Sequence, residues 1–161
     1  MKSAVLSLLS CFVLSLSACE KLPVPPEQEQ QKQPEDNGQQ NGNEDNQSMT
    51  IKITAGGKTF TADIEDSETG KAFLAKLPLS LDMSELNGNE KYCYGVDLPR
   101  SDKHYDSIAT GDLMLYSGNG VVLFYGSAGG NSYTRIGKLS STDGLKEALG
   151  TGNISVTFAK Q

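Results

Sequence analysis

The sequence contains no tryptophan, one histidine and only three cysteines in 161 residues. High-affinity sites for transition metals are usually built from several His or Cys ligands. We therefore expect neither a metal nor a cofactor. The single histidine, His104, lies between Asp102 and Asp106. We interpret it as a solvated loop residue, because a catalytic triad is defined by geometry and not by proximity in sequence.

The chain also lacks an excess of basic charge. It has 14 Lys and Arg against 20 Asp and Glu, a formal net charge of -6. Proteins that bind nucleic acid usually carry a basic patch or stripe, and no such cluster is visible, so we expect no nucleic-acid partner. Much of the acidity lies in residues 23–47, where four Glu and two Asp are opposed by Lys32 alone.

No apolar stretch is long enough to suggest a transmembrane helix. The stretch over residues 4–18 holds 15 residues, several of them serine, whereas a span needs about 20 apolar residues. A lysine precedes it and small residues follow it, as in a secretory signal peptide. Residues 16–19 (LSAC) resemble the bacterial lipobox. We expect residues 1–18 to be a lipoprotein signal peptide and Cys19 to be lipidated; an ordinary cleaved signal and a retained anchor are the alternatives.

Lipidation at Cys19 would make the membrane a permanent partner, because several acyl chains anchor a protein far more firmly than one. We expect an extracytoplasmic location in the cell envelope, with the periplasmic and surface faces both open. Cys11 would leave with the signal peptide, so Cys93 would be the one free thiol and no intramolecular disulfide could form. We interpret Cys93 as a small buried hydrophobic residue on a strand.

The composition divides the rest of the chain into two parts. Residues 19–47 contain the lipidated cysteine and a segment rich in Gln, Asn, Glu and Pro. Such a segment cannot bury enough apolar surface to fold, so we predict a disordered tether. Residues 48–161 have the length of one domain.

Alternating apolar residues and frequent turn signals predict a mainly β domain. We expect eight strands, at residues 50–54, 58–64, 79–83, 91–96, 112–116, 121–125, 133–139 and 154–158. Two short helices are expected, one capped by Asp66 and stopped by Pro78, the other over residues 143–149. Residues 100–110 and 127–132 are expected to be loops. Many short strands favour a closed or nearly closed barrel, which leaves no exposed edge.

The same alternation predicts which residues form the core. The strand over residues 121–125 is apolar throughout, so we expect both of its faces to be covered. In residues 91–96, Tyr92 and Tyr94 share one face and Cys93 lies on the other. The predicted core comprises Ile51, Ile53, Phe60, Phe73, Leu77, Leu115, Leu123, Ile136, Val156 and Phe158.

Several motifs resemble the cyclophilin-like domain family, as found in lipoproteins of gut-type anaerobic bacteria. They are residues 50–54 (TIKIT), 57–62 (GKTFTA), 76–79 (KLPL), 83–92 (MSELNGNEKY), 111–116 (GDLMLY), 123–125 (LFY) and 133–138 (YTRIGK). The resemblance covers nearly all of residues 50–158. It implies a closed eight-stranded barrel with helices at its ends.

The resemblance does not by itself imply catalysis, because one fold hosts many functions. Prolyl isomerases of similar fold have an aromatic-x-Arg stretch followed by Phe-x-x-Gln-Gly-Gly-Asp. Here Tyr133 and Arg135 match the first half only, and no Gln-Gly-Gly-Asp follows. We predict a non-enzymatic module that binds a peptide or small ligand; the alternative is a peptidyl-prolyl isomerase acting on envelope proteins.

We assign no catalytic residue and predict four candidate ligand-binding residues: Arg135, Tyr133, Glu85 and Asn87. Arg135 could offer paired donors to a carboxylate or a peptide carbonyl. It could also form an ion pair with Glu85 or simply lie at the surface. Asn87 lies beside Gly88 in what could equally be an ordinary turn.

Overall fold

The computed structural model describes residues 49–161. The predicted signal peptide, Cys19 and the predicted tether lie outside the described residues. Within residues 49–161, neither helix has the length and apolar character needed to cross a bilayer.

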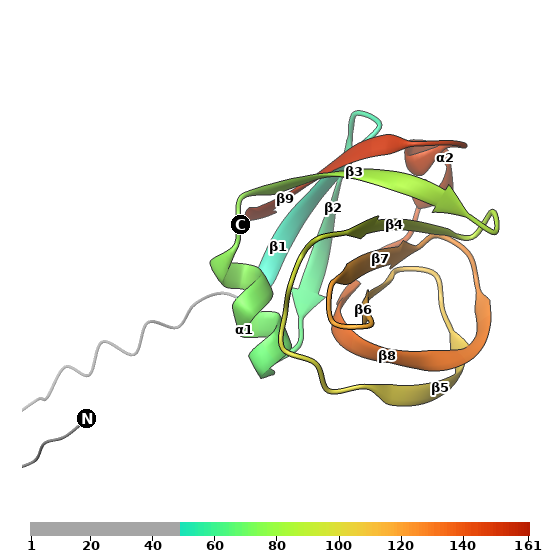
Figure 1. Cartoon of the computed structure of the whole chain (residues 1–161). Coiled ribbons are helices and arrows are strands. Elements are labelled where there is room, and N and C mark those ends of the chain that lie inside the picture. Colours follow the sequence, from blue (N-terminus) through green and yellow to red (C-terminus); the bar gives the residue numbers. More distant parts are fainter. Residues whose placement is uncertain (1–48) are drawn as a thin grey trace, which may run out of the picture. The chain divides into compact units, whose positions relative to one another are not determined.

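Nine antiparallel strands and two short helices make up the described part of the chain (Figure 1). The helices are α1 (Glu68–Ala75) and α2 (Leu145–Leu149). The strands are β1 (Thr50–Ala55), β2 (Lys58–Ile64), β3 (Leu79–Leu86), β4 (Glu90–Tyr94), β5 (Lys103–Ile108), β6 (Asp112–Tyr116), β7 (Gly120–Phe124), β8 (Ala128–Leu139) and β9 (Ile154–Lys160).

Eight of these strands form a closed ring. The order is β2-β1-β9-β3-β4-β7-β6-β8, and β8 pairs again with β2. These eight strands are the eight that alternation predicts, so the prediction of a closed eight-stranded arrangement is confirmed. The ring closes where Gly137 faces Ile64. A Cβ atom at Gly137 would lie 2.4 Å from the carbonyl oxygen of Asp63, so this contact requires glycine.

The two expected loops at residues 100–110 and 127–132 are instead largely strands, and this part of the prediction is wrong. Residues 103–108 form β5, which pairs with the first half of β8 from Lys103↔Tyr133 to Ile108↔Ala128. The pair lies outside the ring as an extension, with β5 along the lower rim in Figure 1. Both segments are polar or glycine-rich, so neither shows the apolar alternation that predicts a strand.

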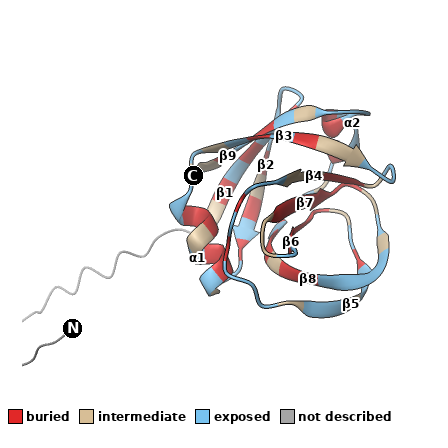
Figure 2. Ribbon diagram, viewed as in Figure 1, coloured by how far each residue is buried: buried red, intermediate tan, exposed pale blue. Residues whose placement is uncertain are grey.

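The interior of the ring is the main hydrophobic core. Nine of the ten predicted core residues are buried, from Ile51 to Phe158, and Figure 2 shows buried segments along the ring strands. Leu77 is only partly buried. Helix α1 ends at Ala75, and Leu74 takes the buried position beside Phe73. Phe73 packs edge-on against Phe158, with ring centroids 5.5 Å apart.

The cap of α1 also differs from the prediction. Ser67 is the N-cap, and its hydroxyl accepts a hydrogen bond from the Gly70 amide at 3.1 Å. Asp66 lies one residue earlier and forms an exposed ion pair with Lys71. Both residue types satisfy free amides at a helix start, so composition alone does not choose between adjacent candidates.

A partly buried ionic group lies on the core side of β4. Lys91 is fully buried and donates to the carboxylate of Glu85 and to the Gly152 carbonyl. The Tyr125 hydroxyl donates to the other oxygen of Glu85. Lys91 and then Tyr125 hold the pKa of Glu85 below its usual value. Burial, with help from Glu85, raises the pKa of Tyr125 to about 12.

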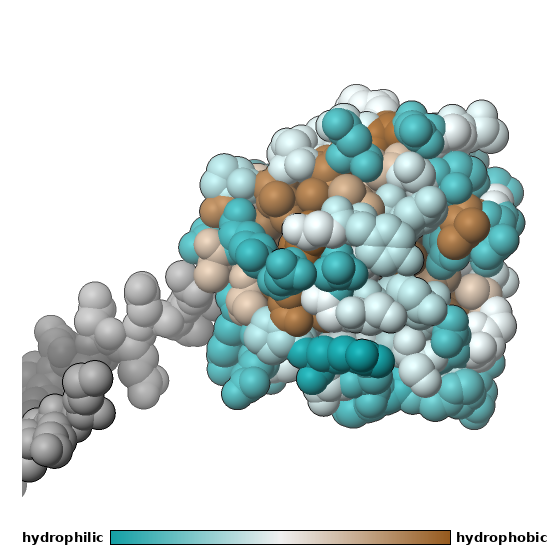
Figure 3. Space-filling model, in the orientation of Figure 1, coloured by the Kyte–Doolittle hydropathy of each residue, from teal (hydrophilic) through white to brown (hydrophobic). Residues whose placement is uncertain are grey.

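A second, smaller hydrophobic cluster lies on the outer face of the ring, where the extension covers it. It consists of Ile108, Met114, Val122, Phe124 and Tyr133. Strand β7 therefore packs on both sides, as predicted, with Val121 and Leu123 in the main core. The face shown in Figure 3 is otherwise a mixture of hydrophilic and pale side chains with scattered hydrophobic patches.

Candidate functional site

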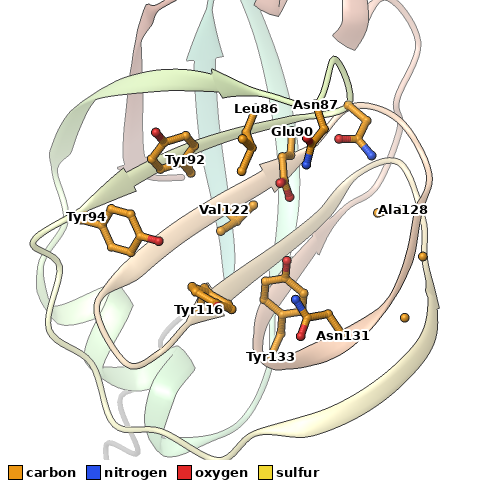
Figure 4. Close-up of a pocket in the computed structure, with 13 residues that line it drawn as sticks. Leu86, Asn87, Glu90, Tyr92, Tyr94, Tyr116, Val122, Ala128, Asn131 and Tyr133 are labelled. Atoms are coloured by element: carbon orange, nitrogen blue, oxygen red, sulfur yellow. The ribbon is translucent and has the colours of Figure 1, made fainter.

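A pocket of about 530 Å³ opens on the outer face of the ring, beside the second cluster (Figure 4). We call it the tyrosine pocket. Strands β4, β6 and β7 form its floor, and the first half of β8 forms a wall. It is lined by Leu86, Asn87, Asn89, Glu90, Tyr92, Tyr94, Tyr116, Val122, Ala128, Gly129, Gly130, Asn131 and Tyr133. Its volume lies within the range of ordinary small-molecule sites, about 300–1,000 Å³.

The alternation of β4 decides which side chains reach this pocket. Successive residues of a strand point to opposite faces. Glu90, Tyr92 and Tyr94 line the pocket, while Lys91 and Cys93 face the main core. The predicted separation of the two tyrosines from Cys93 is confirmed.

Four of the six tyrosines of the chain line the pocket. They form two ring pairs: Tyr92 with Tyr94, centroids 5.6 Å apart, and Tyr116 with Tyr133, centroids 5.5 Å apart. Tyr94 is 55% exposed and Tyr116 is 36% exposed, whereas Tyr133 is buried. An exposed aromatic surface of this kind, beside polar groups, is typical of a recognition site.

Glu90 is the single carboxylate among the lining residues. It is 6% exposed, and Figure 4 shows its side chain beside Asn87 and Val122, with the carboxylate directed toward the Tyr133 hydroxyl. No ion pair found among residues 49–161 includes Glu90. Burial raises its pKa, against a smaller opposing effect of a hydrogen bond from Asn87. Burial and the nearby Glu90 also raise the pKa of Tyr133.

Amide side chains and glycines complete the rim. The Asn89 amide donates to the Ser127 carbonyl at 2.9 Å, and its buried carbonyl oxygen has no hydrogen-bond partner. Asn131 accepts a hydrogen bond from the Ser132 amide at 2.7 Å. A Cβ atom at Gly129 would meet nothing within 4 Å, so a ligand can approach the backbone closely there.

Of the four candidate residues, the structure brings Tyr133 and Asn87 together in the tyrosine pocket. Arg135 lies elsewhere, in a second cavity of about 320 Å³ that also contains Lys103 and Tyr105. Its guanidinium lies 5.0 Å from the centroid of the Tyr105 ring and 3.6 Å from the buried Asp112. The side chain is 31% exposed.

Glu85 does not reach the pocket either, because it turns inward to Lys91 and Tyr125. The ion pair between Arg135 and Glu85, open from the sequence, is not formed. Lys138 is a second cation near Asp112, at 3.3 Å, and the Ala109 amide donates to the same carboxylate at 3.0 Å. Arg135 is thus partly a structural residue.

The other chemically distinctive residues lie apart from the pocket. His104 is exposed, as expected, 3.7 Å from Asp106, but it lies on strand β5 and not in a loop. Asp102 pairs with Arg100 at 2.5 Å and accepts a hydrogen bond from Thr134 at 2.7 Å. Cys93 is half-buried against the main core, and burial raises the pKa of its thiol.

The sequence reasoning missed Glu90, Tyr94 and Tyr116 as members of one pocket. The alternation of residues 90–94 could have identified Glu90, because it places Glu90 on the same strand face as Tyr92 and Tyr94. Tyr116 could not be found in this way, because only the pairing of β6 with β7 and β8 places it near them.

The pattern that defines the cyclophilin-like family matches residues 53–159. A comparison with curated proteins gave no match. Two solved structures are similar in fold, each with 18% sequence identity and a TM-score of 0.56. One is the solution structure of the hypothetical protein AF2241 from Archaeoglobus fulgidus, matched over 71% of this chain and 96% of that one. The other is McbB in complex with tryptophan, matched over 69% of this chain and 44% of McbB. Because the family pattern covers more than half of the sequence, the chain belongs to the cyclophilin-like family.

Proposed function

We propose that this cyclophilin-like protein is a lipid-anchored, extracytoplasmic binding module that holds a peptide or small ligand in the tyrosine pocket. One observation carries the proposal: a cavity of about 530 Å³ on the outer face of the ring collects four tyrosines around a buried carboxylate. A few polar groups within an aromatic and apolar lining are typical of a ligand site.

The location is proposed from the sequence. Cys19 follows a short apolar segment and small residues, and the acidic tether would give the domain reach above the bilayer. A random coil of the roughly 28 residues after Cys19 has a root-mean-square span of about 30 Å. Such a module could search for ligand while it stays attached to the membrane.

We propose binding rather than catalysis because of the groups that line the pocket. Hydroxyl, thiol and amine nucleophiles are commonly activated by an adjacent base, and the lining residues include no Ser, Cys, Lys or His. The alternative, proline isomerisation, rests on the match of Tyr133 and Arg135 to the aromatic-x-Arg stretch of prolyl isomerases. Arg135 stacks on Tyr105 in the second cavity and does not share the pocket with Tyr133.

Amide NMR of the full chain in mild detergent tests the binding proposal. The probes are a library of short peptides and of small neutral, acidic and basic compounds. Tryptophan is included because McbB, which has a similar fold, was solved with it. We expect some probes to shift signals of Tyr92, Tyr116 and Gly129 saturably. A screen in which no probe perturbs these residues would contradict the proposal.

A proline-isomerisation assay on the same preparation tests the alternative. We expect rates equal to the uncatalysed background. Catalysis that is lost in Arg135→Ala and retained in Tyr94→Leu would support the isomerase and place its active site in the second cavity.

A further inference from the structure

Resting on the proposed function, we infer that the tyrosine pocket recognises its ligand through an organic cation, an alkylammonium group, with Glu90 as the counter-charge. The group could belong to a free amine or to a lysine side chain of a peptide. Both sources share the chemistry that the pocket would recognise.

The first argument is the unbalanced charge of Glu90. Buried carboxylates in proteins are normally paired with a cation or held by several donors. Glu90 is 6% exposed, and Asn87 is the side chain that opposes the effect of its burial. The adjacent Lys91 cannot serve, because it points to the opposite face and is bound to Glu85.

Two other cavities differ from the tyrosine pocket in the charged residues that line them. The second contains Arg135 and Lys103 as well as Glu65. The third contains Lys58 as well as Asp143. Each therefore holds charges of both signs, whereas the tyrosine pocket holds a carboxylate and no basic residue. A cationic ligand would supply the missing charge, and an anionic ligand would be repelled by it.

The second argument is the arrangement of the aromatic rings. The Tyr92–Tyr94 pair comes from β4 and the Tyr116–Tyr133 pair from β6 and β8. Figure 4 shows these two pairs on different sides of the pocket, with Val122 between them and the carboxylate of Glu90 directed toward the hydroxyl of Tyr133. The faces of tyrosine rings attract cations within about 6 Å of the ring centroid. Aromatic rings around one carboxylate therefore favour an ammonium group over a neutral group of the same shape.

Matched probe pairs test this inference. Butylammonium is compared with butanol, and the peptide acetyl-Gly-Lys-Gly-amide with its norleucine analogue, each titrated into the full chain in mild detergent. The NMR signals of the pocket residues report binding. The variants are Glu90→Gln, Tyr94→Leu and, as a control for net charge, Glu147→Gln on the exposed face of α2. Gln is close to Glu in size, and amide spectra establish that each variant is folded.

We expect each cationic probe to bind at least about tenfold more tightly than its neutral partner, as a charge-assisted contact implies. Glu90→Gln should abolish this preference, Tyr94→Leu should reduce it, and Glu147→Gln should leave it unchanged. Tighter binding of butylammonium than of the lysine peptide would identify a free amine as the ligand type. Tighter binding of the lysine peptide would identify a peptide.

Two results would overturn the inference. Neutral probes could bind the pocket as tightly as cations, or the preference for cations could survive in Glu90→Gln. In either case the pocket would still be a binding site and the proposed function would stand. If no probe of any charge perturbs the pocket, the proposed function and this inference fall together.

Discussion

At the scale of single residues, Glu90 has an unfavourable environment. Burial raises its pKa, so over the interval between the unfolded and folded pKa values the folded state binds more protons. Stability therefore falls as the pH rises through that interval. A carboxylate placed at the expense of stability is typical of a functional site, where requirements of activity oppose those of folding.

We expect Glu90→Gln to unfold at a higher temperature than the wild type near neutral pH. This difference in unfolding temperature should shrink as the pH falls toward about 4.3, the ordinary glutamate pKa. At that pH the wild-type carboxyl is protonated and, like the glutamine side chain, carries no charge. Thermal melts over this pH range provide the measurement. A variant that is less stable than the wild type at neutral pH would mean that Glu90 has a stabilising partner.

Lys91 and Glu85 present the opposite case, because the fully buried lysine depends on the half-buried glutamate for its counter-charge. Glu85→Ala should cost about 3–5 kcal/mol, because it leaves the charge of Lys91 buried without a partner. The double variant Glu85→Leu with Lys91→Met should recover much of that loss, since it removes both charges. Chemical denaturation measures both effects, and equal stability of the single and double variants would contradict the prediction.

The pH dependence of this group follows from its pKa shifts. The pKa of Glu85 is lowered, so its contribution is present above about 4.3 and lost as the pH falls through the folded value. The pKa of Tyr125 is raised to about 12. Its contribution is present below about 10, the ordinary tyrosine pKa, and lost as the pH rises toward the folded value.

Arg135 combines a structural contact with partial exposure. Arg135→Ala should lower stability by about 1–2 kcal/mol, between the values for exposed and buried ion pairs, since Lys138 still faces Asp112. Ligand binding in the tyrosine pocket should not change, because Arg135 lies in the second cavity. Denaturation and probe titration together check this, and weakened pocket binding in a folded variant would restore Arg135 as a binding residue.

At the scale of elements, the β5–β8 extension makes the pocket. The first half of β8 supplies Ala128, Gly129 and Asn131 to the wall, and Ile108 of β5 anchors the extension to the second cluster. The pairing of β8 with β6 contains a register shift between Leu113 and Met114. A shift of this kind bends a strand, and here it lies between the part of β8 that pairs with β2 and the part that pairs with β5.

Two glycines of β8 provide a matched test of this arrangement. Gly137→Ala should destabilise the protein by about 1–3 kcal/mol, as overpacking does, because the new Cβ would meet a backbone oxygen. Gly129→Ala should be nearly neutral in thermal melts, since a Cβ there enters open space. Equal effects at the two positions would contradict the close approach of β2 and β8.

At the scale of the whole molecule, the proposed anchor and the pocket have separate roles. The anchor would keep the domain at the membrane, and the pocket would select the ligand. We predict that Cys19→Ser abolishes incorporation of labelled fatty acid and leaves the precursor uncut by the lipoprotein peptidase. Incorporation at the wild-type level would contradict lipidation at Cys19.

The sequence by itself determined the ring. Alternation of apolar residues and frequent turns defined all eight ring strands, because each strand has one face in the main core. It also placed Tyr92 and Tyr94 on the face opposite Cys93, and it identified nine buried core residues correctly. These features depend on local spacing, which is visible without knowledge of the fold.

Only the tertiary structure decided the site. Strand β5 and the start of β8 are polar or glycine-rich, so their pairing is stabilised by contacts between segments far apart in the sequence. Glu85 and Asn87 are two residues apart, yet one faces Lys91 in the interior and the other lines the pocket. Tyr133 and Arg135 are also two residues apart and lie in different cavities. The Tyr133 ring packs against Phe124, whereas the guanidinium of Arg135 lies over the ring of Tyr105 on β5. Which residues meet in the pocket is set by the pairing of β6 with β7 and β8 and by the β5–β8 extension, and neither is visible in local spacing.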